Sequence, residues 1–367
     1  MLMTNPPSAA DVKLAIEDIA KRYGPTAALE PTTLDVRRGE FLTLLGPSGS
    51  GKTTLLMMIA GLVEPSAGRI CLEGEDITAR PAYRRDIGLV FQNYALFPHL
   101  TVAENVAFPL EMRRLPRAEI AKAVAEALEL VRLPHLGARY PRELSGGQQQ
   151  RVAFARAIVF KPRLVLMDEP LGALDKKLRE ELKLELRKLH RDLGATIVYV
   201  THDQDEAMLL SDRICLMANA RIAQVDAPSD LYNRPRSRFA AEFIGESNIL
   251  PGSLRRTAAG GWQVALDNGP DLACLAPEQP GEGRVPVLIR PERIRLAPAM
   301  AEEGFAATVE TVLDLGGIRR IGLATASGLR LEAIALGSAT GGFAVGEAVA
   351  CAVTPADVVP LAPGEAS

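Results

Sequence analysis

The sequence predicts an α/β domain with a parallel sheet, followed by a small all-β domain. Up to about residue 240, short apolar runs typical of buried strands alternate with helical segments, as in a parallel sheet. One of these runs, residues 41–45, leads through a glycine-rich loop into a helix that begins near Lys52. Further on, glycine, alanine, proline and short alternating runs favour a β-barrel or sandwich. We expect domains over residues 1–240 and 241–367, with a helical subdomain at about 93–158.

The composition narrows the class of protein. The chain has 367 residues, enough for two or three domains with large cores. Its 42 Lys and Arg against 45 Asp and Glu leave no basic excess for nucleic acid. The four cysteines are far apart, which fits a reducing compartment without disulfides. The N-terminus lacks a signal-peptide pattern and no apolar run is long enough to span a membrane, so we expect a soluble, cytosolic chain.

Residues 11–40 have the pattern of strand, turn and strand, and Tyr23 lies at the break. An aromatic side chain there can stack on an adenine ring, because every base has a π-face. The alternative is an ordinary tyrosine at a strand end. The glycine-rich loop that follows in the sequence favours the stacking role.

That loop has the pattern G-x-x-x-x-G-K-[ST], between a strand and a helix. Its glycines allow successive backbone N–H groups to turn toward phosphates, and the helix adds the positive end of its dipole. Lys52 supplies a charge to the phosphates, and the Thr53 hydroxyl is placed to ligate Mg²⁺. A plain glycine-rich turn is the alternative. We predict a nucleoside triphosphate site formed by Gly46, Pro47, Ser48, Gly49, Ser50, Gly51, Lys52, Thr53 and Thr54.

Gln92 follows a buried strand predicted over residues 87–91. Ligands gather beyond the carboxyl ends of strands in such sheets, so Gln92 can reach a metal or an attacking water. A solvated strand end is the alternative. The next residues, 93–100, are unusually apolar for a loop. They indicate either an exposed surface for a partner or side chains that pack locally.

Residues 101–139 are helical in pattern, and Ser145 then suits the N-cap of a helix that runs to about Phe160. Gly146 and Gly147 are poor choices for a first helical turn unless the backbone must approach something closely. A second anion site over residues 145–148 is therefore a candidate, with an ordinary turn as the alternative. These residues are too far along the chain to belong to the same cradle as the first loop.

An apolar strand predicted over residues 163–167 ends in Asp168 and Glu169. Adjacent carboxylates at the end of a buried strand are costly to desolvate unless they hold a metal and a water. Asp168 suits Mg²⁺, directly or through water, and Glu169 is then free to orient or deprotonate an attacking water. Acidic residues that cap a helix before Pro170 are the alternative.

The helix predicted over residues 176–193 has one leucine face that we assign to the core. The leucines are Leu178, Leu182, Leu186, Leu189 and Leu193, and Gly194 ends the helix. Residues 196–200 form the next buried strand, which ends beside His202. A lone histidine is more often structural, but at this end of the sheet it can sense a γ-phosphate.

In this order, the motifs resemble those of the ATP-binding subunits of ABC transporters. The resemblance covers roughly residues 11–240 and implies a P-loop NTPase (RecA-like) fold with a helical subdomain. The matching positions are residues 46–53 (Walker A), Gln92 (Q-loop), Ser145, Gly146, Gly147 and Gln148 within residues 144–148 (signature), Asp168 and Glu169 (Walker B), Asp175 (D-loop), His202 (switch) and Tyr23 (A-loop). Gly172 departs from the family, which usually has serine there.

The remainder resembles the OB/TOBE-like barrel of importer ATPases, at residues 243–248 and 289–292. Together with residues 91–98, these stretches are similar to the spermidine/putrescine, iron and sugar importer branch. Polyamine-type subunits are the most similar overall, which implies ATP-driven uptake of a polyamine-like solute. Iron(III), sugar or phosphonate import remain alternatives.

The resemblance implies a head-to-tail homodimer in which Lys52 of one copy and Ser145 of the other hold one ATP. Glu169, His202, Lys52 and Gln92 would then be catalytic, and Mg²⁺ would contact Thr53, Gln92 and Asp168. The apolar loop after Gln92 would grip a transmembrane permease, which receives its cargo from a solute-binding protein. The chain would lie on the cytoplasmic face of the membrane.

Two other classes of function remain to be weighed. A soluble ABC ATPase of translation or DNA repair predicts either two nucleotide domains in one chain or a long coiled coil before the signature, and the sequence has neither. A regulatory module, in which the β-rich tail senses a small molecule, is compatible with the transport role.

Overall fold

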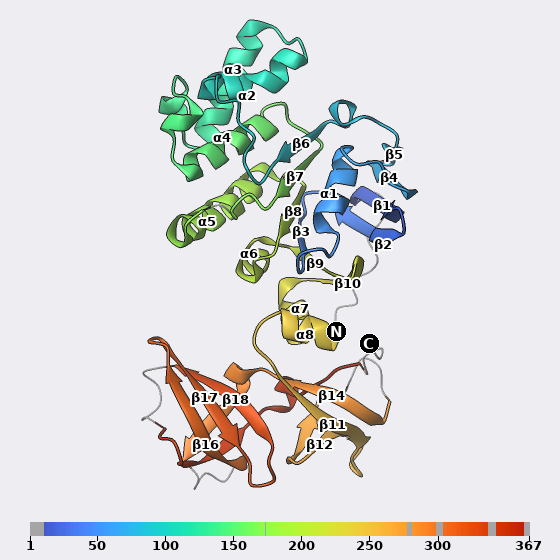
Figure 1. The fold of residues 1–367 in the computed structure, drawn as a ribbon, viewed down its shortest axis with the longest axis vertical. Coiled ribbons are helices and arrows are strands. Elements are labelled where there is room, and N and C mark those ends of the chain that lie inside the picture. Colours follow the sequence, from blue (N-terminus) through green and yellow to red (C-terminus); the bar gives the residue numbers. More distant parts are fainter. Residues whose placement is uncertain (1–10, 173, 277–280, 299–303, 337–342, 363–367) are drawn as a thin grey trace. The chain divides into compact units, whose positions relative to one another are not determined.

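The computed structural model of the chain describes residues 11–172, 174–276, 281–298, 304–336 and 343–362 (Figure 1). The chain forms two compact units, Met1–Pro228 and Ser229–Ser367. Residues 1–10 and 363–367 of the expected domains lie outside the described residues. The division comes before the expected boundary at 240/241, because Arg290 of the second unit donates to the Tyr232 carbonyl at 2.9 Å. Helix α8 (Arg238–Phe243) packs on the same unit through Ala241, which contacts Leu288 and Leu361.

The first unit is built on a six-stranded sheet with the strand order β10-β9-β3-β8-β7-β6. Its strands are β3 (Phe41–Leu45), β6 (Ile87–Val90), β7 (Leu164–Asp168), β8 (Ile197–Thr201), β9 (Arg213–Ala218) and β10 (Arg221–Asp226). All pairs are parallel except β9 with β10. Leu45 pairs with Thr201 and Asp168 pairs with Val200, so three strands end at the same edge. Polar residues that follow these strands therefore meet there.

A second sheet in this unit is antiparallel, with the order β2-β1-β4-β5. Its strands are β1 (Val12–Tyr23), β2 (Thr26–Arg37), β4 (Ala67–Leu72) and β5 (Glu75–Asp76). Helix α1 (Lys52–Ala60) shares one buried cluster with both sheets through Leu55, Leu14 of β1 and Leu164 of β7. The helix that follows the glycine loop is thus fixed from two sides.

A buried arginine fixes the far end of α1. Arg85 is 2 % exposed, and its guanidinium donates to the carbonyls of Met58, Ile59, Thr78 and Arg80 at 2.7–2.8 Å. The last carbonyls of a helix lack partners within the helix, and a cation there also complements the helix dipole. Arg85 therefore anchors α1 to the segment that leads into β6.

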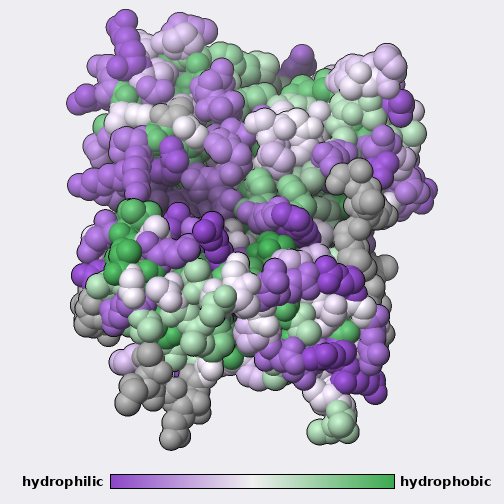
Figure 2. Space-filling view, turned by 60° about the horizontal axis from the view of Figure 1, so that its bottom comes forward, coloured by the Kyte–Doolittle hydropathy of each residue, from purple (hydrophilic) through white to green (hydrophobic). Residues whose placement is uncertain are grey.

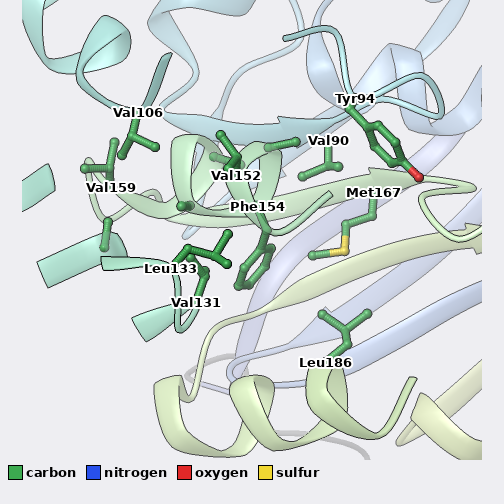
Figure 3. Packing of buried hydrophobic residues seen from close by; sticks show 14 of the residues in the cluster. Val90, Tyr94, Val106, Val131, Leu133, Val152, Phe154, Val159, Met167 and Leu186 are labelled. Atoms are coloured by element: carbon green, nitrogen blue, oxygen red, sulfur yellow. The ribbon is translucent and has the colours of Figure 1, made fainter. Parts of the chain in front are cut away.

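Helices form the rest of the first unit. They are α2 (Val102–Met112), α3 (Arg117–Leu130), α4 (Gly146–Ile158), α5 (Lys176–Leu193) and α6 (Gln204–Leu210). Figure 1 shows α2, α3 and α4 grouped together and away from α1. Their core continues to the sheet, and Figure 3 shows Val152 and Phe154 of α4 in one cluster with Val90 and Met167.

The leucine face of α5 is buried for most of its length. Leu182 and Leu186 are buried, and Leu178 and Leu189 are partly buried against the same core. The assignment of Leu193 to the core is wrong, since its side chain is 38 % exposed. Leu193 is the last helical residue, and the left-handed Gly194 turns the chain there.

The second unit is rich in β-structure, as predicted. Its strands are β11 (Asn248–Arg256), β12 (Trp262–Leu266), β13 (Asp271–Cys274), β14 (Gly283–Ile289), β15 (Arg295–Pro298), β16 (Phe305–Asp314), β17 (Ile318–Ala324), β18 (Arg330–Leu336), β19 (Ala348–Ala352) and β20 (Val359–Pro360). They form two five-stranded antiparallel sheets, β13-β12-β11-β14-β20 and β15-β19-β16-β17-β18. One buried cluster joins both sheets, with Val264 and Val287 from the first and Val309 and Ile321 from the second.

Arg290 ties the start of this unit to its sheet. Its buried guanidinium donates to the carbonyls of Tyr232 at 2.9 Å and of Ala241 and Glu246 at 3.0 Å, and it lies 4.2 Å from the centre of the Tyr232 ring. Tyr232 belongs to α7 (Pro228–Asn233). The segment from α7 to β11 is therefore folded around one cation.

On the face in Figure 2, hydrophobic residues are interspersed with hydrophilic ones. Among the helices of the described residues, none combines the length and the apolar character that a membrane span requires.

Candidate functional site

The loop between β3 and α1 has a backbone that only glycine tolerates at two positions. Gly46 and Gly51 have φ angles of 156° and 97°, in the region that favours glycine. A Cβ at Gly46 would lie 2.2 Å from the Met217 carbonyl oxygen, and one at Gly51 would lie 2.9 Å from that of Ala28. The loop is therefore packed closely between β9 and β2, and its curvature leads directly into the N-terminus of α1.

Two buried polar side chains of this loop are set for an anion. Lys52 is 6 % exposed, and its ammonium donates to the carbonyls of Gly46 at 2.8 Å and Pro47 at 2.9 Å. Burial lowers the pKa of Lys52, while the nearby Glu169 and Asp168 carboxylates act in the opposite direction. The buried Ser50 Oγ has no hydrogen-bond partner among the described residues. A glycine cradle with a cation and an unsatisfied hydroxyl fits a phosphate group.

Thr53 of helix α1 and Asp168 at the end of strand β7 bring two oxygen ligands together. The Thr53 hydroxyl donates to Asp168 Oδ1 at 3.3 Å. Burial raises the pKa of Asp168, and the hydrogen bond from Thr53 partly opposes this shift. Hydroxyl and carboxylate oxygens suit Mg²⁺, which takes its other ligands from water and substrate phosphates. Within the described residues, no three His, Cys, Asp or Glu side chains gather as a metal site, so the fit depends on this pair.

The side chains of Glu169 and His202 contact each other at the same edge of the sheet. Glu169 Oε2 lies 3.2 Å from His202 Nδ1, and the side chains are 22 % and 61 % exposed. Glu169 has a φ angle of 42°, which is unfavourable for a residue with a side chain, and its N–H donates to the Val200 carbonyl at 3.0 Å. The backbone therefore turns sharply after Asp168. The Glu169 carboxylate faces His202, whereas the Asp168 carboxylate accepts from Thr53.

Gln92 is exposed and lies near the turn that follows Glu169. Its Nε2 is 3.9 Å from the position that a Cβ on Gly172 would occupy, and the Glu169 carbonyl is 3.4 Å from it. Both distances are ordinary van der Waals contacts, so the serine usual in the family would fit at residue 172. The structure thus brings Gln92, Glu169 and Gly172 together.

The predicted signature residues lie elsewhere, at the N-terminus of α4. Ser145 is the N-cap, as predicted: its hydroxyl accepts from the Gln148 N–H at 3.4 Å, and Gln148 Oε1 accepts from the Ser145 N–H at 3.0 Å. Figure 1 shows α4 well apart from α1. Asp175 caps α5 by accepting from the Leu178 N–H at 3.0 Å. Tyr23 is 56 % exposed at the end of β1.

The two glycines of α4 do allow a close approach, but the group that approaches them is a side chain of the protein and not an anion. A Cβ on Gly147 would lie 3.1 Å from Leu178 and 3.2 Å from Leu182, and one on Gly146 would lie 2.9 Å from Leu174. The leucine face of α5 therefore occupies the space beside the first turn of α4. The sequence alone suggested only an anion for this role.

The apolar loop after Gln92 is partly folded into the core. Tyr94 is 6 % exposed and belongs to the cluster with Val90 and Met167 (Figure 3). Arg156 of α4 donates to the carbonyls of Tyr94 and Ala95 at 2.7 Å. Of the two alternatives that the sequence left open for this loop, local packing therefore holds at Tyr94. Farther along, Pro98 and His99 are exposed.

Sequence reasoning missed three residues around His202. Glu206 is 2 % exposed and accepts hydrogen bonds from the Tyr199 and Thr201 hydroxyls at 2.7 Å. Asp203 caps α6, and Arg179 of α5 lies 3.5 Å from its carboxylate. Asp203 followed by Glu206 at the third position is the spacing of a helix cap, a signal available in the sequence. No local pattern indicates Arg179.

Comparison with known proteins places the chain. Residues 29–172 match the ABC transporter family, and residues 287–361 match the TOBE domain. The spermidine/putrescine import ATP-binding protein PotA of Chromobacterium violaceum is 47 % identical over 326 residues, which cover 88 % of this chain and 90 % of the relative. The chain belongs to the ABC transporter family. The PotA protein of Pseudomonas aeruginosa is a further relative of this ABC protein, 46 % identical over 349 residues, with coverage of 92 % and 96 %.

A solved structure supports the fold of the ABC domain. The cbiO1 protein of Clostridium perfringens, described as part of the ABC transporter complex cbiONQ, is 32 % identical with a TM-score of 0.57. It matches 64 % of this chain and 93 % of its own length. The predicted fold, an ABC ATPase domain followed by a TOBE-containing β-rich region, is confirmed.

Proposed function

We propose that this ABC protein hydrolyses ATP to drive import of a polyamine such as spermidine or putrescine. The observation that carries the ATPase assignment is the meeting of Lys52, the Thr53–Asp168 pair and the Glu169–His202 pair at one edge of the sheet. The proposed cargo is supported by relatives of 46–47 % identity whose names state spermidine/putrescine import. Iron(III), sugar and phosphonate are the alternative cargoes.

The side chains have distinct roles in this proposal. Lys52 contributes a positive charge where negative charge develops on the phosphates, and the glycine loop contributes backbone N–H groups. Glu169 accepts the proton of the attacking water, and His202 orients Glu169 through the 3.2 Å contact. Thr53, Asp168 and Gln92 would together be the ligands of Mg²⁺. When bound, Mg²⁺ neutralises phosphate charge.

A second copy of the chain completes each site in this proposal. The signature residues at the start of α4 lie apart from α1 in the same chain, and the exposed Ser145 can face the nucleotide of a partner. Ser145, Gly146, Gly147 and Gln148 would then contact the ATP of the opposing subunit, with Asp175 nearby in the interface. Tyr23, exposed at the end of β1, would stack on the adenine. ATP would favour the closed dimer, and hydrolysis would release it.

The permease-docking surface in this proposal is the end of the loop after Gln92, around Leu96, Phe97 and His99. Phe97 packs on Phe108 of α2 with ring centres 4.6 Å apart, so the loop is held firmly against the helical subdomain. Gln92, at the start of this loop, would couple occupancy of the nucleotide site to the conformation of the permease. The chain would be peripheral on the cytoplasmic face of the membrane, and a solute-binding protein would deliver cargo.

Steady-state ATPase rates of the Glu169→Gln variant test the proposed chemistry. We expect turnover to fall by about 10²–10⁴-fold, the usual contribution of a general base, with ATP affinity retained. Glu129→Gln, an exposed change of the same type on α3, serves as the control and should hydrolyse normally. A normal rate in Glu169→Gln would remove this residue from the mechanism.

Uptake of labelled putrescine and spermidine tests the cargo. The chain would replace the Pseudomonas aeruginosa relative in a strain that lacks it, with Glu169→Gln as the inactive control. Restored polyamine uptake supports the proposal. The chain's own permease, purified with it, should likewise show polyamine-stimulated ATPase activity; stimulation by iron(III) or a sugar instead would assign the alternative cargo.

A further inference from the structure

A buried carboxylate lies beneath the segment that carries His202. The Glu206 carboxylate, on α6, accepts hydrogen bonds from the hydroxyls of Tyr199 and Thr201, each with an oxygen–oxygen distance of 2.7 Å. The Thr201 oxygen in turn accepts from the Asp203 N–H at 3.0 Å. The residues on both sides of His202 are therefore bound into one network, and Tyr199 below them is fully buried. Such a network limits the positions that the His202 backbone can take.

Asp203 connects this network to the surface of α5. One carboxylate oxygen accepts from the Glu206 N–H at 3.0 Å and caps α6. The other lies 3.5 Å from Arg179 Nη1. The two side chains are 28 % and 25 % exposed, so water screens the pair only in part. Asp203 thus uses its two oxygens for two different elements.

Arg179 also holds the segment that begins with Glu169. Its Nη2 donates to the Leu174 carbonyl at 2.9 Å, just before the Asp175 cap of α5. The other end of that segment is fixed because the Glu169 N–H donates to the Val200 carbonyl at 3.0 Å. One planar guanidinium therefore joins the end of the Glu169 segment to the turn beside His202, which Lys could not do with the same geometry.

We propose that Arg179 is a positioning residue that, through Asp203 and Leu174, holds the His202 imidazole against the Glu169 carboxylate. The pair itself lies at the exposed end of the sheet, with His202 61 % exposed, and the contacts of Arg179 supply a constraint from the side of α5. The inference depends on the proposed roles of Glu169 and His202.

Purified full-length Arg179→Gln and Asp203→Asn proteins test this role. Asparagine keeps the N-cap of α6 and removes only the charge. We expect kcat for ATP hydrolysis to fall by about 10- to 10²-fold in each variant, since an error of about 1 Å in a catalytic group has effects of this size, with KM changed less than about twofold. Arg191→Gln, an exposed arginine in the last turn of the same helix, is the matched control and should keep the wild-type kcat.

A second experiment separates positioning from a general effect on folding. In the His202→Ala background, measured with radiolabelled ATP so that slow turnover is visible, Arg179→Gln should cause little further loss of kcat. The double variant Arg179→Gln/Asp203→Asn should lose no more than either single one. The inference would be overturned if Arg179→Gln lowered kcat by the same factor with and without His202. It would also be overturned if the losses of kcat multiplied in the double variant, or if both single variants kept the wild-type kcat.

The same series distinguishes this inference from the proposed function. If Glu169→Gln hydrolyses ATP normally, the proposed mechanism is wrong. If Glu169→Gln is inactive while Arg179→Gln has the wild-type kcat, the mechanism stands and only the positioning role is lost.

Discussion

Glu73 lies at the centre of an ion network that connects both sheets of the first unit. It follows β4, and its carboxylate accepts from Lys13 of β1 at 2.6 Å, from Arg38 at 2.8 Å and from Arg163 at 2.8 Å. Arg163 comes directly before β7, the strand that ends in Asp168. Hydrogen bonds from Lys13, and then from Arg38, lower the pKa of Glu73 from its ordinary value of 4.5 to about 2. The network therefore stabilises the fold while Glu73 is ionised.

The Glu73→Gln variant keeps the shape of the side chain and removes its charge. A pKa held at about 2 in place of 4.5 corresponds to about 3 kcal/mol at neutral pH. The Glu73 side chain is 28 % exposed and that of Arg38 is 56 % exposed, so solvent screening reduces the expected loss to about 1–2 kcal/mol.

The stability lost in Glu73→Gln should become smaller as the pH falls. Because the folded pKa is depressed, the stabilisation is complete above about 4.5 and is lost as the pH falls toward about 2. Urea unfolding followed by far-UV circular dichroism at pH 7.5, 4 and 3 would measure the difference between wild type and Glu73→Gln. Glu64→Gln, at an exposed position, is the control. A difference of the same size at all three pH values would refute the reasoning.

Two further predictions concern packing and docking. Arg85→Met should lower the free energy of unfolding by about 3–5 kcal/mol, because it leaves buried carbonyls at the end of α1 without a donor. Thermal unfolding measures the effect, with the exposed Arg84→Met as the control. Equal melting temperatures for the two variants would contradict the prediction. Leu96→Ser should reduce co-purification with the permease at an unchanged melting temperature, whereas Tyr94→Ser should lower the melting temperature, and full permease retention by Leu96→Ser would exclude this docking surface.

Local patterns were sufficient to predict most of the nucleotide edge of the sheet. The glycine loop, Glu169 and His202 each follow a buried strand, Asp168 is the last residue of one, and parallel strands bring their carboxyl ends together. The predicted caps at Ser145 and Gly194 are confirmed for the same reason, since capping depends on a few neighbouring residues.

Contacts between distant segments were not predictable from these patterns. Tyr94 is buried because α4 and the sheet close around it, and nothing in its apolar neighbours distinguishes that outcome from exposure. Gly146 fits against Leu174, which precedes α5, and Gly147 fits against leucines of α5, whose position depends on the whole first unit. Arg179 contacts a carboxylate that follows a different strand. Such pairings depend on the tertiary arrangement and not on sequence spacing.

Arg290 has a practical consequence for work on the C-terminal part of the protein. A fragment starting at residue 241 would lack both the Tyr232 carbonyl and the aromatic ring that shield its guanidinium. The Ala241 and Glu246 carbonyls remain as acceptors, but an interior cation that loses one acceptor and its aromatic cover is costly, so that fragment should be less stable. Cloning from Ser229 keeps these groups and is the better starting point for ligand screening on the β-rich unit.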